Sequence, residues 1–212
     1  MVNKKIEFEF FDEEEFKKFL DKLPSKDAIK VMSMIDNIEI RGIQSSIKNQ
    51  WVKKLDDNLF EIRSKSSNNI QRGIYFHVKD SRYIITHFFT KKDQKTPKRQ
   101  NVKLNVGKIG VNYTLLGGNQ MNRVLEEYAA ERELKEPGFA EEWENEKVQN
   151  RIADQIYNIR KNLGLSQREF AKLVGKPQST IGRIESREVN ASLDTIVSIA
   201  NATNKKLIVE LV

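Results

Sequence analysis

Residues that end and begin helices crowd the C-terminal third of this chain, and they constrain its fold more than any other feature. Gly164 follows an apolar stripe of helical period, at a place where glycine lets the chain leave a helix with positive φ. Ser166 and Glu169 have the spacing of a capping box, in which each side chain bonds the backbone of the other residue. Gly175 ends a second helix, and Pro177 occupies the first position of a third. This stretch therefore predicts short helices joined by tight turns.

Four helices follow from this pattern within residues 149–204. Ser192 caps the fourth, and the small side chain of Ala171 lies where the second and third helices approach closely. The spacing across Gly175 is that of a helix-turn-helix, so we expect this domain to bind double-stranded DNA. The apolar residues expected to face its core are Ile152, Ile156, Ile159, Leu163, Phe170, Leu173, Val174, Ile181, Ile184, Leu193, Ile196 and Ile199.

The third of these helices carries the side chains that would read DNA. Glutamine and arginine pair in bidentate fashion with the edges of adenine and guanine in the major groove. The residues expected at the bases are Gln178, Ser179, Thr180 and Arg183. The residues expected at phosphates are Gln167, Arg168, Lys172 and Lys176.

The same segment resembles the Cro/Xre repressor family. The resemblance covers nearly the whole domain and rests on Leu165-Ser166-Gln167, Phe170-Ala171 and Ile181-Gly182-Arg183-Ile184-Glu185. It implies a homodimer on a palindromic operator. Residues 206–212 alternate like a strand, which could pair between the two subunits.

Size and composition fit a globular protein of two domains. The chain has 212 residues, of which 38% are hydrophobic and 32% are charged. No apolar run approaches the roughly 20 residues that cross a bilayer. Acidic residues interrupt the apolar stretch near the N-terminus, which argues against a secretory signal. Cysteine is absent, which excludes disulfides and thiolate metal sites and favours the cytoplasm.

The formal net charge of +7 favours a polyanionic partner, and its distribution is uneven. Basic residues outnumber acidic ones by more than two to one over residues 41–103. The sign reverses over residues 126–146, where nine glutamates face only Arg132 and Lys135. This order suggests that the acidic segment covers something basic.

The first hundred residues predict a small α+β domain. A strand over residues 6–11 leads to Asp12, which can cap a helix, and a second helix ends by Gly42. Three strand-like runs follow in close succession, at residues 59–64, 70–78 and 83–90. Their turns are short enough for hairpins, so the pattern predicts two helices on one face of an antiparallel sheet.

The chain therefore divides into four predicted segments. Residues 1–100 form the α+β domain, and residues 101–120 form a glycine-containing linker. Residues 121–147 form an acidic helical segment, and residues 148–212 form the all-α helix-turn-helix domain with its C-terminal strand. Met121 opens its helix like the start of a formerly separate protein, which suggests a natural or engineered fusion, or a chain processed at this point.

Cations of the three strands are expected to meet on one sheet face. Arg63 and Arg72 lie in paired strands, and Lys91-Lys92 ends the third. The region resembles the RelE/HigB toxins, particularly the HigB-like branch of phage genes, over residues 19–99. The most specific piece of this resemblance is Phe88-Phe89-Thr90-Lys91-Lys92-Asp93-Gln94-Lys95-Thr96-Pro97. It implies a ribosome-dependent mRNA endonuclease that uses no metal or other cofactor.

The resemblance also implies roles for these residues. Arg63 would lie near the ribose 2′-hydroxyl, Arg72 would stabilise the phosphate, and Lys92 with Lys91 would serve the leaving oxygen. An arginine side chain stays protonated, which makes Arg63 a poor general base. Its expected role is therefore electrostatic. His77 is expected to face solvent or core, and His87 is a secondary acid–base candidate. Further RNA contacts are expected from Lys65, Tyr75, Phe89 and Lys95.

Both patterns in one chain suggest a RelE/HigB-like toxin fused to a HigA-like antitoxin. The acidic segment would dock on apolar toxin surface through Leu125, Tyr128, Phe139 and Trp143. Its glutamates would screen the cations, in cis within one chain or in trans across a dimer. Two alternatives stay open, a DNA-binding regulator whose first domain has lost catalysis, and a phage-type repressor with an unrelated RNA-binding module.

Overall fold

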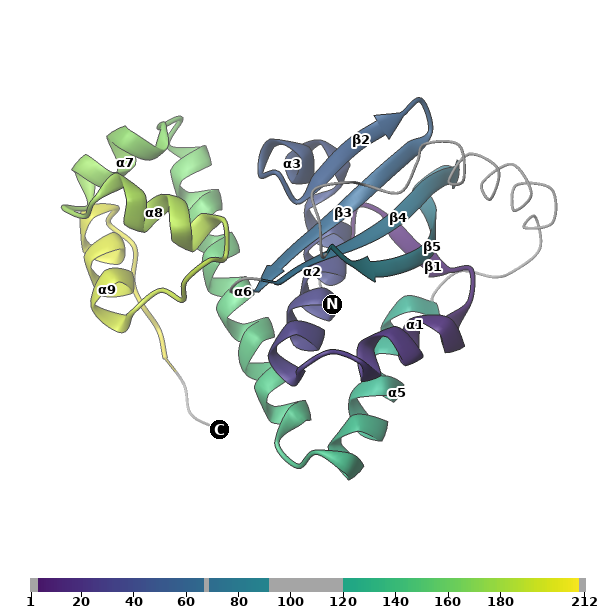
Figure 1. Ribbon diagram of the computed structural model, residues 1–212. Coiled ribbons are helices and arrows are strands. Elements are labelled where there is room, and N and C mark those ends of the chain that lie inside the picture. Colours follow the sequence, from purple (N-terminus) through teal and green to yellow (C-terminus); the bar gives the residue numbers. More distant parts are fainter. Residues whose placement is uncertain (1–3, 67–68, 92–119, 210–212) are drawn as a thin grey trace. The chain divides into compact units, whose positions relative to one another are not determined.

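The computed structural model describes residues 4–66, 69–91 and 120–209 (Figure 1). The chain divides into two compact units, Met1–Trp143 and Glu144–Val212. Within the described residues, no helix has the length and apolar character needed to span a membrane.

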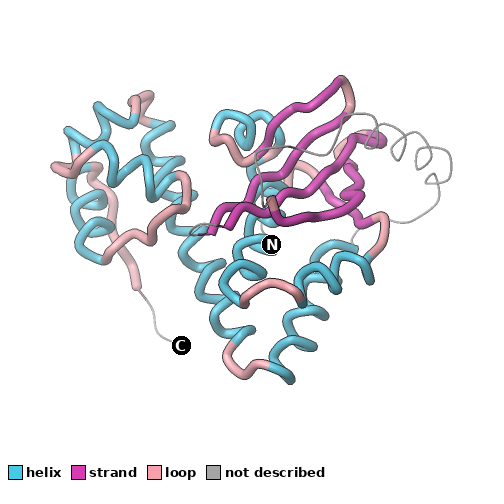
Figure 2. Tube along the Cα trace, in the orientation of Figure 1, coloured by secondary structure: helices cyan, strands magenta, loops and turns pink. Residues whose placement is uncertain are grey.

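The first unit is built on a five-stranded sheet in the order β1-β5-β4-β3-β2 (Figure 2). The strands are β1 (Glu7–Phe10), β2 (Val52–Asp56), β3 (Leu59–Ser66), β4 (Asn69–Lys79) and β5 (Arg82–Thr90). Strands β2 to β5 pair antiparallel through successive hairpins, which confirms the predicted meander. Strand β1 pairs parallel with β5 and forms the other edge of the sheet.

Capping residues place the helices of this unit. The Asp12 side chain accepts from the backbone N–H of Glu15 at 2.8 Å and begins α1 (Glu13–Asp21), as predicted. Helix α2 (Ser25–Arg41) ends at Gly42, whose φ of +77° is open to glycine without strain. The short helix α3 (Ile43–Lys48) and strand β2 were not expected, because neither has a clear apolar period.

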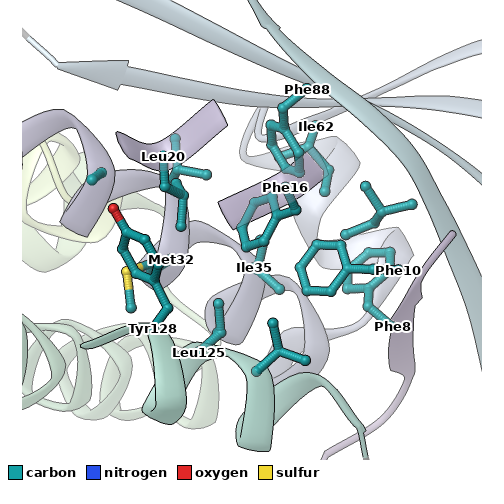
Figure 3. Packing of buried hydrophobic residues seen from close by; sticks show 14 of the residues in the cluster. Phe8, Phe10, Phe16, Leu20, Met32, Ile35, Ile62, Phe88, Leu125 and Tyr128 are labelled. Carbon is teal, nitrogen blue, oxygen red and sulfur yellow. The ribbon is translucent and has the colours of Figure 1, made fainter. Parts of the chain in front are cut away.

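Helices α1 and α2 pack on one face of the sheet and enclose the core. Figure 3 shows Phe16 and Leu20 of α1 and Met32 and Ile35 of α2 in this layer. Close packing requires glycine at position 73, because a Cβ there would lie 2.5 Å from the Phe88 ring.

The acidic segment belongs to the same core. Its helix α5 (Gln120–Lys135) and the start of α6 (Phe139–Asn162) contribute buried side chains to the cluster that α1, α2 and the sheet form. Leu125 and Tyr128 lie against the helical layer in Figure 3. Together these contacts make the segment a structural part of the first unit.

The second unit contains the rest of α6 with α7 (Gln167–Leu173), α8 (Gln178–Glu185) and α9 (Leu193–Ala202). Ser166 and Glu169 form the predicted capping box, and Ser192 caps α9. Pro177 precedes α8 as its N-cap, one residue earlier in the helix than predicted. With the sheet of the first unit, these helices confirm the predicted fold class, α+β followed by a helix-turn-helix domain.

Three predicted core residues of this unit are instead exposed. Leu163, Leu173 and Leu193 lie at the ends of helices, where their side chains face solvent. The core of this unit is filled by other residues, including Phe170, Ile181 and Ile184. The predicted C-terminal strand is also absent from the part of the tail that the structure describes, residues 205–209. Pairing of this tail between two subunits stays a prediction.

Candidate nucleic-acid-binding sites

The predicted cations of the first unit do gather on one face of the sheet. Arg63 and Arg72 are direct cross-strand partners in β3 and β4, and Phe89 of β5 lies opposite Arg72. Strand alternation places Lys65 and Lys91 on the same side. We call these five residues the cationic face; it is the side of the sheet away from α1 and α2.

A buried carboxylate that sequence reasoning missed holds the two arginines together. Glu61 is 3% exposed, and its Oε1 accepts from Arg63 Nε at 2.8 Å and from Arg72 Nη1. Burial lowers the pKa of Arg72, and the neighbouring Glu61 opposes that shift. Its position two residues before Arg63 on the same strand was the available signal, since such residues share a face.

The two arginines differ in what they can offer a ligand. The Arg63 side chain is 32% exposed, whereas that of Arg72 is 10% exposed. The Arg72 Nε has no hydrogen-bond partner within the described part of the chain. An anion reaching Arg72 would therefore find an unused donor, but it would compete with Glu61 for the guanidinium.

Tyr75 is not on the cationic face, which corrects the expectation that it stacks on RNA. Its side chain is fully buried, stacked on Phe60 at 5.3 Å and edge-on to Phe8 at 4.9 Å. Burial raises the pKa of its hydroxyl. Phe89 is half-buried in a small apolar cluster and stays a candidate for stacking. Lys92 and Lys95 lie outside the described residues.

The two histidines occupy opposite ends of β4 and β5. His77 is half-buried, its ring 4.9 Å from that of Tyr83. His87 lies on the same sheet face as Phe89, and their rings stack at 5.9 Å. His87 is therefore the histidine beside the cationic face.

The second unit exposes most of the predicted DNA contacts. Gln178, Ser179 and Arg183 on α8 are exposed, and Thr180 is half-buried. The predicted phosphate contacts Arg168 and Lys172 on α7 are exposed. Arg183 lies 3.8 Å from Glu188 with both side chains 59% exposed, so this weak pair can give way to DNA.

A buried ion pair connects the helices that would meet DNA. Arg160 donates to both carboxylate oxygens of Glu185, at 2.6 and 2.7 Å. Glu185 also accepts from Gln167 at 2.9 Å, and Gln167 in turn accepts from Gln178 at 3.2 Å. The hydrogen bond to Glu185 raises the pKa of Arg160. This chain of bonds fixes the start of α8 against α6 and α7.

The remaining predicted phosphate contact, Lys176, is already paired. Its ammonium group forms an ion pair with Asp194 at the start of α9. The Asp194 side chain is exposed, so the pair is accessible to solvent and a phosphate can replace the carboxylate.

The four predicted contacts of the acidic segment are all buried in the first unit. Leu125 and Tyr128 of α5 and Phe139 and Trp143 of α6 belong to its core cluster. Arg132 supports them by donating to the Tyr128 hydroxyl at 3.0 Å.

Within the described residues, the glutamates of the acidic segment pair with the helical layer and not with Arg63 or Arg72, which differs from the predicted screening of these two cations. Glu131 pairs with Lys17 of α1 at 2.8 Å, and Glu136 accepts from Ser25 of α2. The carboxylate on Arg63 and Arg72 is Glu61, from the sheet itself. The acidic segment is therefore bound to the helical layer, the side opposite the cationic face.

Two parts of the chain match known families. Residues 18–103 match phage-derived proteins of the Gp49-like family, and residues 156–209 match a helix-turn-helix family. No curated protein matches the chain. The chain thus combines a Gp49-like, toxin-like domain with a Cro/Xre-type DNA-binding domain. This is the composition of a toxin–antitoxin-like regulator.

Proposed function

We propose that this protein is a toxin and its antitoxin in one chain. The Gp49-like domain is a metal-independent, ribosome-dependent mRNA endonuclease of the HigB-like branch, held inactive by the acidic segment that follows it in the first unit. The second unit binds operator DNA as a homodimer and represses transcription of its own gene in the cytoplasm.

The burial of α5 in the first unit is the observation that carries this proposal. Residues 104–155 lie outside both family matches, and they contain α5 and most of α6. Val124 and Leu125 of this segment are nearly inaccessible to solvent, inside a core built mostly by the Gp49-like domain. A segment that follows the Gp49-like match in the chain and fills the core of that domain has the property expected of an antitoxin.

Inhibition would act through the helical layer. Since α5 contacts β1 as well as the helical layer, it would hold the domain in a closed form or block its approach to the ribosome. The tether keeps the segment at an effective concentration of the order of millimolar, so contact within one chain is favoured over release.

The cationic face would supply the chemistry. Arg72, assisted by Arg63, would neutralise the charge that develops on the phosphate. Lys91 and Lys92 would serve the leaving 5′ oxygen, and Phe89 would stack on a base with Lys65 and Lys95 on the RNA backbone. Glu61 would have to release Arg72 to the substrate.

The test is growth arrest on expression of residues 1–107, alone and together with residues 120–212. We expect arrest by the first piece alone, and relief by the second piece or by Arg72→Ala. Lys79→Ala, which removes an exposed cation from the same sheet, is the matched control and should arrest growth like the parent. Soluble, folded residues 1–107 that leave growth unchanged would contradict the endonuclease.

A second function is favoured by one observation, the pairing of both Arg63 and Arg72 with the one carboxylate of Glu61. A sheet whose two arginines already share a buried carboxylate fits a regulatory domain without catalysis. The protein would then be a DNA-binding regulator only. Operator binding fits both functions, and RNA cleavage fits only the first.

A further inference from the structure

The contacts of His87 determine which ring nitrogen carries its proton. The Thr86 hydroxyl oxygen lies 3.1 Å from the carbonyl oxygen of Ile74 and 2.9 Å from Nδ1 of His87. A hydroxyl has one proton and a carbonyl only accepts, so Thr86 donates to Ile74 and accepts from His87. The neutral ring is therefore protonated on Nδ1, and Nε2 keeps a lone pair.

The other histidine has the opposite arrangement. The His77 Nε2 lies 2.8 Å from the carbonyl oxygen of Asp80, and this contact requires a proton on Nε2. The chain has only these two histidines. Each is thus an internal reference for the other in any measurement of tautomer.

His87 lies within reach of the cationic face. It pairs with Ile74 across the β4–β5 ladder, while Phe89 pairs with Arg72, so His87 and Arg72 are diagonal neighbours. Such neighbours are about 7–8 Å apart on a sheet. A scissile phosphate held by Arg72 would bring an adjoining ribose hydroxyl close to the His87 ring.

Burial favours the neutral form of His87, and the charged groups around it oppose this only in part. Asp12 and Glu15 line a small cavity with it on the α1 side, and Arg72 lies diagonally across on β4. Burial lowers the pKa of His87, and Glu15 opposes this shift to a smaller extent. A neutral imidazole with a free Nε2 can accept a proton at physiological pH.

We propose that His87 is the general base of the RNA cleavage proposed above, and that Thr86 is its positioning residue. The inference rests on that proposed function. Nε2 takes the proton of the ribose 2′-hydroxyl as its oxygen attacks phosphorus. The bond from phosphorus to the 5′ oxygen breaks, and this oxygen takes a proton from the ammonium group of Lys91. The products are a 2′,3′-cyclic phosphate and a 5′-hydroxyl.

The first measurement is the tautomer of both histidines in the full chain, by long-range ¹H–¹⁵N NMR. We expect a proton on Nδ1 of His87 and on Nε2 of His77. His77→Asn assigns the remaining signal to His87. Thr86→Val, which removes the acceptor, should move the His87 proton toward Nε2, and Thr86→Ser should restore it. An Nε2 proton on His87 in the parent chain would overturn the proposal.

The second measurement is cleavage of ribosome-bound mRNA by the full chain with α5 loosened by Leu125→Ala and Arg132→Ala, its folding checked by circular dichroism. His87→Gln should lower the rate about 100-fold or more and remove the acidic limb of the pH profile. Thr86→Val should lower the rate about tenfold, with rescue by Thr86→Ser. His77→Asn should cleave like the loosened parent.

The outcomes separate the two proposals. If Arg72→Ala abolishes cleavage while His87→Gln cleaves with an unchanged pH profile, the role of His87 is wrong and the endonuclease stands. If the folded, loosened chain cleaves no RNA, the endonuclease proposal fails, and the role of His87 fails with it.

Discussion

The guanidinium of Arg132 in α5 donates to the backbone carbonyl of Leu20 in the last turn of α1, at 3.4 Å. It also donates to the carbonyl of Leu23 at 3.2 Å and lies 5.5 Å above the Phe139 ring. The carbonyls at a helix C-terminus carry partial negative charge, so a cation there is stabilising. The Leu20 carbonyl also accepts from the backbone N–H of Leu23 at 3.0 Å, and Arg132 is a second donor to it. Arg132 thus joins the acidic segment to the end of α1 by contacts that depend on the folded backbone.

Arg132→Ala should weaken the attachment of α5 more than its surface charge suggests. The change removes one hydrogen-bond donor from each of two carbonyls and also removes a cation–π contact. Together these losses cost about 2 kcal/mol of unfolding free energy. Urea unfolding of the full chain measures this loss. Arg123→Ala is the matched control, because its side chain is 51% exposed and pairs with glutamates at the surface, so its loss should change the free energy of unfolding much less than the loss of Arg132. Equal losses in the two variants would show that Arg132 is an ordinary surface cation.

Local signals in the sequence were sufficient for most of the fold. Asp12, Ser166 and Ser192 cap helices where their spacing predicted, because capping depends on three or four adjacent residues. The facing of Arg63 and Arg72 also followed from strand alternation.

The surface on which the acidic segment packs could not be predicted in the same way. Its charge pattern suggested a cover for cations, yet its apolar residues decide where it binds, and the glutamates take partners nearby on α1 and α2. The buried position of Tyr75 likewise depends on β1, which joins the sheet from the far end of the sequence. Contacts between residues far apart in the sequence leave no pattern in the sequence around either residue.

Breaking the Arg160–Glu185 pair should destabilise the second unit strongly. Glu185→Gln keeps the shape of the side chain but leaves the buried guanidinium without its carboxylate, and the expected cost is about 3 kcal/mol. Thermal unfolding of the full chain measures it. Glu188→Gln, at an exposed and weakly paired carboxylate, should change stability by less than about 0.5 kcal/mol. A Glu185→Gln chain as stable as the parent would mean that Arg160 finds other partners.

The exposed side chains of α8 should determine operator affinity. We expect the double variant Gln178→Ala, Arg183→Ala to bind DNA from upstream of its own gene about 100-fold or more weakly, because each bidentate base contact is worth about 1–3 kcal/mol. Fluorescence anisotropy at fixed salt measures the affinity. Lys161→Ala removes one exposed cation from α6 and is the control for net charge. A double variant that binds as tightly as the parent would contradict the recognition role of α8.

The N-terminal strand should lose stability as pH rises toward neutrality. Glu39 of α2 is buried, accepts from the backbone N–H of Phe8 at 2.8 Å and pairs with Lys4. Burial raises the pKa of Glu39 to about 7, against 4.5 for the ordinary group, and Lys4 only partly offsets the shift. Between these two values the folded state keeps a proton that the unfolded chain has released, so the unfolding free energy falls as pH rises through that window.

Removing this carboxyl should flatten the pH dependence. Glu39→Gln keeps the acceptor for Phe8 but does not titrate, so its unfolding free energy should change less between pH 4.5 and 7 than that of the parent. The parent should lose of the order of 3 kcal/mol from this group across that window. Glu7→Gln, at an exposed glutamate of β1, is the control and should keep the parent's slope. Denaturant unfolding at a series of pH values decides the point: parallel curves for the parent and Glu39→Gln would show that Glu39 is ionised throughout and that its pairing with Lys4 outweighs burial.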